Sequence, residues 1–139
     1  MKNTLFTIGC AAVLLAAGCS TIGPSDAGKL QGSWEGTNPK DTSGRKFYLV
    51  LKGKNFDFHD ADQRVFYRGT FSVREDTTPK QFIARLTESC QPQYVGKTSM
   101  AIYQLQDGKL TLAGNEPGNP EPPASFDAPG ADCLELTKH

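Results

Sequence analysis

The sequence has few of the residues from which catalytic and metal sites are built. It holds two histidines, four cysteines and one tryptophan among 139 residues, and no two cysteines show the CxxC spacing of zinc and redox motifs. There is no glycine-rich phosphate loop and no dinucleotide fingerprint. Lys plus Arg and Asp plus Glu are equal at 15 each, so no basic stripe favours nucleic acid. These absences predict a protein without a cofactor or a nucleic-acid partner.

The histidines give little support to catalysis or metal binding. Nucleophilic hydrolysis needs a serine or cysteine beside a base that a third group orients, and no such set is visible. His139 is the last residue, and His59 lies in the acidic segment 57–62. A divalent ion could be held there by His59 with Asp57 or Asp60, but Asp is also an ordinary turn residue. Since alternation turns Asp57 and His59 outward, we predict no metal site, no catalytic residue and no enzyme.

The N-terminal residues indicate export. Lys2 precedes an apolar stretch from Leu5 to Ala17, which is shorter than the roughly 20 residues of a membrane-spanning helix. A charged start, an apolar middle and a small-residue end form a secretory signal. The end of this stretch, Leu-Ala-Ala-Gly-Cys at 15–19, resembles the bacterial lipobox, in which the cysteine is acylated and the preceding peptide is removed. An ordinary cleavable signal with a chance cysteine is the alternative.

The lipobox resemblance implies a division of the chain into three parts. Residues 1–18 are the signal peptide, residues 19–29 the lipidated Cys19 with a flexible tether, and residues 30–139 a single domain. Two or three acyl chains would anchor this domain to a membrane, since each buried methylene contributes about 0.8 kcal/mol. Ser20 stands where an inner-membrane retention signal has Asp. The prediction is a lipoprotein of the outer membrane that faces the periplasm.

Two cysteines remain in the mature domain. Cys10 leaves with the signal and Cys19 is lipidated, so Cys90 and Cys133 are left in an oxidising compartment. Such a pair favours a disulfide. Two free thiols or half of a metal site are the alternatives.

The sequence of the mature domain predicts β-strands. Apolar and polar residues alternate, or short runs of β-forming residues occur, in eight segments, and no segment shows the period of a helix. Gly69 within the longest segment suggests a bend or bulge. A proline-rich stretch at 114–130 reads as a long loop across one end of the sheet. The predicted strands are residues 30–36, 47–51, 55–59, 64–73, 81–87, 100–105, 109–112 and 133–137.

The order of these motifs resembles a family of small bacterial lipocalin-like domains, many of them secreted or lipid-anchored. The likeness covers residues 30–138 and includes the Leu-x-Gly-x-Trp opening at 30–34 and the hairpin Ile-Tyr-x-Leu-x-Asp-Gly-x-Leu-x-Leu at 102–112. It implies an all-β, antiparallel, about eight-stranded lipocalin-like barrel and no established activity. Two features of true lipocalins are missing: the Thr-Asp-Tyr motif and an arginine in the closing strand that covers Trp34.

The interior of such a barrel is the candidate site. Eight strands enclose either a filled core or room for one small ligand, and the sequence leaves both open. Trp34 favours closure of one end of the barrel over ligand contact. The residues predicted to line the interior are Trp34, Phe56, Phe58, Tyr67, Phe71, Phe82, Met100 and Ile102.

Two functions follow from this fold. The first is a non-catalytic module that binds a small apolar or amphipathic molecule inside the barrel. The second is a protein-interaction or inhibitor function in the cell envelope, carried by the proline-rich loop and the segment 88–97, tied together by a Cys90–Cys133 bridge.

Overall fold

The computed structural model describes residues 25–139. The predicted signal peptide, Cys19 and the first part of the tether lie outside the described residues. Within that range, none of the helices has the length and apolar character needed to cross a membrane. The elements in chain order are α1 (Asp26–Lys29), β1 (Gly32–Thr37), β2 (Lys46–Lys52), β3 (Asn55–Asp60), β4 (Val65–Arg74), β5 (Lys80–Ser89), η1 (Pro92–Tyr94), β6 (Thr98–Gln106), β7 (Lys109–Gly114) and β8 (Asp132–Lys138).

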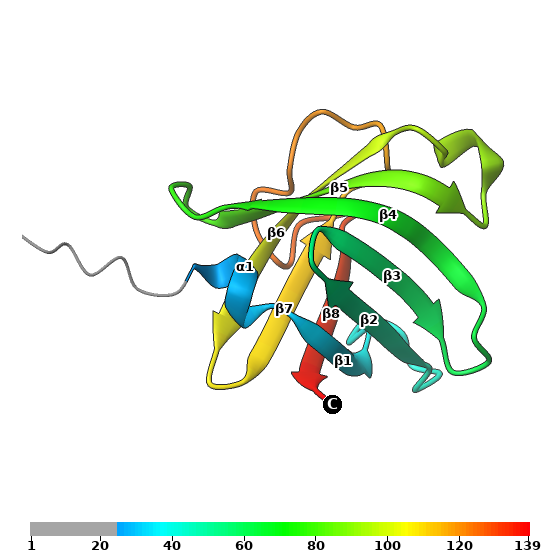
Figure 1. Ribbon diagram of the computed structural model, residues 1–139, viewed down its shortest axis with the longest axis horizontal. Coiled ribbons are helices and arrows are strands. Elements are labelled where there is room, and N and C mark those ends of the chain that lie inside the picture. Colours follow the sequence, from blue (N-terminus) through cyan, green and yellow to red (C-terminus); the bar gives the residue numbers. More distant parts are fainter. Residues whose placement is uncertain (1–24) are drawn as a thin grey trace, which may run out of the picture.

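The eight strands form a closed antiparallel barrel (Figure 1). Each strand pairs with its neighbours in the sequence, and β1 pairs with β8 through Trp34↔Lys138 to Thr37↔Glu135. This up-and-down arrangement leaves no free sheet edge. The predicted all-β, eight-stranded barrel is confirmed, and every predicted strand overlaps an observed one. Membership of the lipocalin-like family stays a prediction.

Two glycines let the wall of the barrel close. The pairing of β4 with β5 shifts register between Arg68 and Gly69, as the predicted bend required. A Cβ atom on Gly69 would overlap the backbone oxygen of Arg85, and one on Gly36 would overlap that of Glu135 in β8. Only a residue without a side chain allows the backbones to approach so closely.

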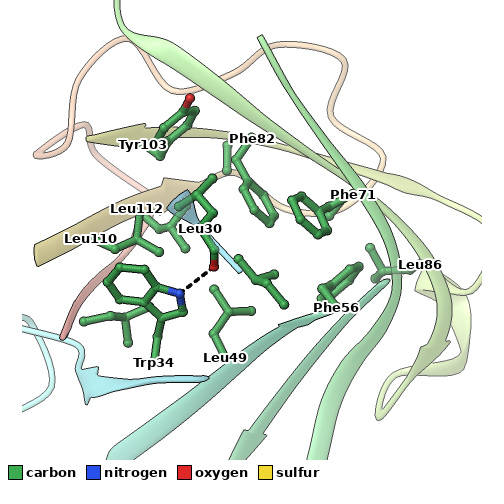
Figure 2. Close-up of a cluster of buried hydrophobic side chains, with 14 residues drawn as sticks. Leu30, Trp34, Leu49, Phe56, Phe71, Phe82, Leu86, Tyr103, Leu110 and Leu112 are labelled. Carbon is green, nitrogen blue, oxygen red and sulfur yellow. Dashed lines mark hydrogen bonds between the residues drawn. The ribbon is translucent and has the colours of Figure 1, made fainter. Parts of the chain in front are cut away.

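One end of the barrel is sealed around Trp34 (Figure 2). The indole is 1% exposed, and its N–H donates a hydrogen bond to the backbone oxygen of Leu30 at 2.8 Å. The Nζ atom of Lys138 lies 5.2 Å from the ring centroid. This lysine of the closing strand covers the tryptophan in the absence of the arginine found in true lipocalins.

The segment expected to be the end of the tether is part of this seal. Asp26 in α1 is only 5% exposed. Its Oδ2 accepts hydrogen bonds from Lys80 Nζ at 2.7 Å and from the Tyr103 hydroxyl at 2.8 Å, and its backbone N–H donates to Glu75. The prediction of a flexible tether to Lys29 is therefore wrong for residues 26–29, because a buried carboxylate and the buried Leu30 fix them to the barrel.

The middle of the proline-rich loop covers the outside of the barrel, whereas its two ends reach the open end of the barrel through Asn115, Glu116, Pro117 and Gly130. A second apolar cluster, separate from the main core, lies beneath it and contains Ile102, Ala113 and Ala131, with Phe126 and Ala128 packed against it. The prediction that Met100 and Ile102 line the interior is wrong, since Ala101 and Tyr103 belong to the core and successive residues of a strand alternate.

The predicted disulfide is absent. Cys90 and Cys133 are both free thiols. Cys90 is exposed just after β5, whereas Cys133 is buried in β8 and pairs with Ala113 of the outer cluster. Strands β5 and β8 are not neighbours in the barrel, so β6 and β7 stand between the two positions. Burial raises the pKa of the Cys133 thiol, and the charge of Glu135 adds to the shift.

Candidate ligand cavity

The open end of the barrel contains a cavity of about 420 Å3. It lies at the end away from α1, where β1 runs into β2, β3 into β4, β5 into β6 and β7 into β8. Its walls are mostly apolar, and its polar residues come mainly from the ends of strands and the loops. The lining residues are Asn38, Arg45, Phe47, Leu49, Phe56, Phe58, Phe66, Tyr67, Phe82, Ala84, Leu86, Gln91, Tyr94, Ser99, Ala101, Leu112, Gly114, Asn115, Glu116, Pro117, Gly130, Asp132 and Leu134.

A row of aromatic rings forms one wall of the cavity. The ring of Phe58 in β3 stacks on Phe47 of β2 at 5.6 Å between centroids and on Tyr67 of β4 at 6.3 Å. Tyr67 in turn lies 6.5 Å from Tyr94 in η1. Three strands and one loop thus contribute to a continuous aromatic surface, which reaches from inside the barrel to its mouth.

A bulge adds a further ring that strict alternation does not predict. Phe58 pairs with Tyr67, but the next residue, His59, pairs with Val65, so Phe66 is the extra residue of β4. Phe66 and Tyr67 therefore both line the cavity although they are neighbours in sequence. The guanidinium of Arg64 lies 5.9 Å from the Phe66 ring. The only sequence signal was an adjacent aromatic pair near the start of a strand.

The predicted interior residues divide into three groups. Phe56, Phe58, Tyr67 and Phe82 line the cavity. Trp34 and Phe71 belong to the packed core that fills the rest of the barrel, where Phe71 stacks on Phe82 at 5.1 Å (Figure 2). The third group, Met100 and Ile102, faces outward as described above.

Charged and polar groups surround the mouth. The Tyr94 hydroxyl donates a hydrogen bond to Glu116 Oε1 at 2.5 Å, which raises the pKa of Tyr94 to about 12. This bond links the loop after β5 to the loop after β7. The described residues offer no ion-pair partner to the exposed side chains of Arg45 and Asp132, which also line the mouth.

Tyr67 is the polar side chain set into the aromatic wall. It is half-buried, and no hydrogen bond of its hydroxyl to another described residue occurs. Burial, followed by electrostatic interactions with Cys90, Asp132 and Glu116, raises the pKa of the phenol. The hydroxyl therefore stays protonated at neutral pH and is available as a donor.

The histidines lie away from the cavity. His59 Nδ1 contacts Asp57 Oδ1 at 2.7 Å on the outer wall, and Arg68 donates to the same carboxylate. Partial burial opposes ionisation of Asp57, but the hydrogen bonds from Arg68 and His59 outweigh it and lower the pKa of the carboxyl. No group of three or more potential metal ligands occurs in the described part of the chain.

No protein-family model, no curated protein and no solved structure matches the chain.

Proposed function

We propose that this protein is a non-catalytic module that binds a small apolar or amphipathic molecule inside its barrel. The observation that carries the proposal is the cavity of about 420 Å3, sealed at one end by Trp34 and open at the other. Ligand pockets occupy roughly 300–1,000 Å3 and are mainly apolar with a few polar groups. A wall of aromatic side chains that face empty space loses packing contacts, which a ligand would restore.

A non-catalytic function fits the chemistry of the lining. Neither His59 nor His139 lines the cavity, and neither do the two cysteines of the mature domain. The polar lining groups are amides, hydroxyls, carboxylates and one guanidinium, which suit recognition and orientation of a bound molecule. The fold adds an analogy only, since eight-stranded barrels have room either for a filled core or for one small ligand.

Filling the cavity tests the proposal. The small Ala84 in β5 lines it, so the ring of Ala84→Phe should occupy part of its volume. We expect the native domain to enhance the fluorescence of the neutral probe N-phenyl-1-naphthylamine and Ala84→Phe to lose at least about tenfold in affinity for it, equal to about 1.4 kcal/mol.

The matched control places the same ring on the other face of the same strand. Arg85 is the exposed neighbour of Ala84, and Arg85→Phe should bind the probe like the native domain. Equal binding by Ala84→Phe and the native domain, both folded, would show that the probe does not enter the barrel and would overturn the proposal.

We also propose that Cys19 carries acyl chains that hold the domain at the outer membrane, facing the periplasm. The support is the lipobox-like segment 15–19 and the Ser that follows it. Cells fed an alkyne-tagged fatty acid should label the native protein but not Cys19→Ser, which should leave the membrane fraction. Cys90→Ser is the control because Cys90 is a free, exposed thiol of the same chain. Label retained on Cys19→Ser would reject the anchor.

An envelope-protein partner is the second candidate. Among the described residues, Val95 is the exposed large hydrophobic side chain, at 50%, and it follows η1 beside the mouth. It lies in the segment 88–97 predicted to contact a partner. In-cell crosslinking from a photoreactive residue in place of the exposed Gln93 should give a discrete adduct that Val95→Asp in the same chain reduces. The absence of an adduct would leave the cavity as the site of function.

A further inference from the structure

The wall of the cavity differs from one half of the barrel to the other in the size of its side chains. Strands β2, β3 and β4 contribute the row of aromatic rings, whereas β5, β6 and β7 contribute a group of small residues, Ala84, Ser99, Ala101 and Gly114. Ala84 pairs directly with Ser99, and Ala101 pairs directly with Gly114. The four small residues therefore form one patch across three adjacent strands.

This small-residue patch lies across the cavity from the rings. In a closed barrel of eight strands each strand faces the one halfway round, so β6 faces β2 and β7 faces β3. The two groups are also at the same end, because β2 and β6 begin at the mouth and β7 ends there. Phe47 and Ser99 are the second residues of β2 and β6, and Gly114 is the last residue of β7.

The aromatic wall favours a ligand that is itself aromatic. The rings of Phe47, Phe58 and Tyr67 are nearly parallel, with angles of 24° and 16° between successive planes. A ring in the ligand can stack with an offset on an aromatic face or meet an aromatic edge, and each such pair strengthens binding by about twofold to tenfold beyond the effect of the buried area. A saturated molecule gains only the effect of the area.

The small-residue patch favours a ligand that is flat. Its side chains extend at most one atom beyond Cβ, so a planar molecule can lie against the strands over its whole face. A puckered saturated ring touches such a wall at fewer atoms, and each missing contact forfeits dispersion energy. The two walls therefore favour the same shape from opposite sides.

We propose that the ligand is a planar aromatic ring compound, held between the row of rings and the small-residue patch. This inference rests on the proposed function of the cavity. A flexible acyl chain could fill the same volume of about 420 Å3, but it would make none of the pairs between aromatic rings.

Two uncharged compounds with the same carbon skeleton and the same hydroxyl group test the preference. 1-Naphthol is flat and aromatic, and decahydro-1-naphthol is saturated and puckered. We expect isothermal titration calorimetry to show that the native domain binds 1-naphthol at least about threefold more tightly. Phe58→Leu keeps an apolar side chain but removes one ring, so it should reduce this preference by about twofold to tenfold.

A pair of variants tests the opposite wall. Ser99→Ala keeps the patch smooth, whereas Ser99→Leu adds a side chain that projects into the cavity. Ser99→Leu should therefore bind 1-naphthol at least about threefold more weakly than Ser99→Ala does. Equal affinities of the two folded variants would show that the ligand does not lie against this patch and would overturn the placement between two walls.

The control for the loss of a ring is Phe126→Leu. Phe126 packs in the outer cluster and does not line the cavity, so its replacement should leave the preference for 1-naphthol unchanged. Decahydro-1-naphthol bound as tightly as 1-naphthol, or a preference unaffected by Phe58→Leu, would overturn the planar aromatic ligand while the cavity remained a binding site. Failure of both compounds and of N-phenyl-1-naphthylamine to bind would overturn the proposed function as well.

Discussion

The two ends of this barrel are built from the same eight strands, but one is solid and the other hollow. At the closed end, Trp34 and Leu30 fill the interior beside α1, and the buried carboxylate of Asp26 accepts hydrogen bonds from Lys80 and Tyr103. At the open end, aromatic rings line a cavity, and polar groups such as Tyr67 and Arg45 have no partner among the described residues. The difference indicates that stability is concentrated at one end, which leaves the other free to bind.

The largest expected effect is the loss of the closing tryptophan. Trp34→Ala removes a fully buried ring and leaves its site empty, so we expect the free energy of unfolding to fall by about 3–5 kcal/mol. Phe58→Ala at the hollow end should cost markedly less, because that ring already faces a cavity. Denaturant unfolding of both variants measures the contrast. Equal losses would contradict the division of the barrel into a stabilising and a binding end.

A smaller effect separates two glycines. Gly69→Ala forces a Cβ against the backbone of Arg85, and overpacking of this kind costs about 1–3 kcal/mol. Gly114 lines the hollow end, where a Cβ would meet only the Ala101 side chain at 3.6 Å and the Ser99 hydroxyl at 3.9 Å, both ordinary contacts. Gly114→Ala should therefore leave the thermal midpoint nearly unchanged. A similar drop for both variants would show that the mouth is as tightly constrained as the wall.

The smallest effect concerns pH at the closed end. The hydrogen bond from Lys80 lowers the pKa of Asp26, against the opposing effect of burial, and the Tyr103 hydroxyl adds to the lowering. A carboxyl whose pKa is lower in the folded state stabilises the fold above its unfolded value of about 3.9, and this stability is lost as the pH falls through the folded pKa.

Asp26→Asn should therefore be less stable than the native domain at neutral pH by about 1–2 kcal/mol, toward the low end for hydrogen bonds to charged groups because Lys80 is partly exposed. The gap should shrink as the pH falls below about 4. Unfolding curves across that range measure it, with Asp62→Asn at an exposed turn as the control for the loss of one carboxylate. A gap independent of pH would mean that the charge of Asp26 contributes nothing.

Alternation of side chains was enough to predict the eight strands and the inward placement of Trp34, Phe56, Phe58 and Phe82. Alternation works because, in a strand that is buried on one face only, hydrophobic side chains occur at every second residue. It fails where the register shifts or where the outer face is covered too. The bulge at Phe66 and the loop over Ile102 are these two cases.

The remaining differences come from contacts between residues far apart in the sequence. In the sequence, Asp26 resembles part of a polar linker. Its hydrogen-bond partners, Lys80 and Tyr103, lie 54 and 77 residues away along the chain. The presence of Cys90 and Cys133 in the mature domain suggests a disulfide, but β6 and β7 lie between them in the barrel. The depth of the cavity also depends on which aromatic rings stack against the barrel wall. The amino-acid composition does not determine this stacking.

The pairing between β1 and β8 is the shortest seam in the barrel. It joins residues 34–37 of β1 to residues 135–138 of β8, so the first three residues of β8, which begin at the mouth, pair with β7 alone. Across this gap the Lys40 ammonium donates to the backbone oxygen of Ala131 at 2.9 Å. Lateral widening of the rim there would break this hydrogen bond and a second one from Lys40 to the backbone oxygen of Ala128, but no pairing between strands. A ligand wider than the mouth of the cavity can therefore enter at this position without breaking the hydrogen bonds between strands.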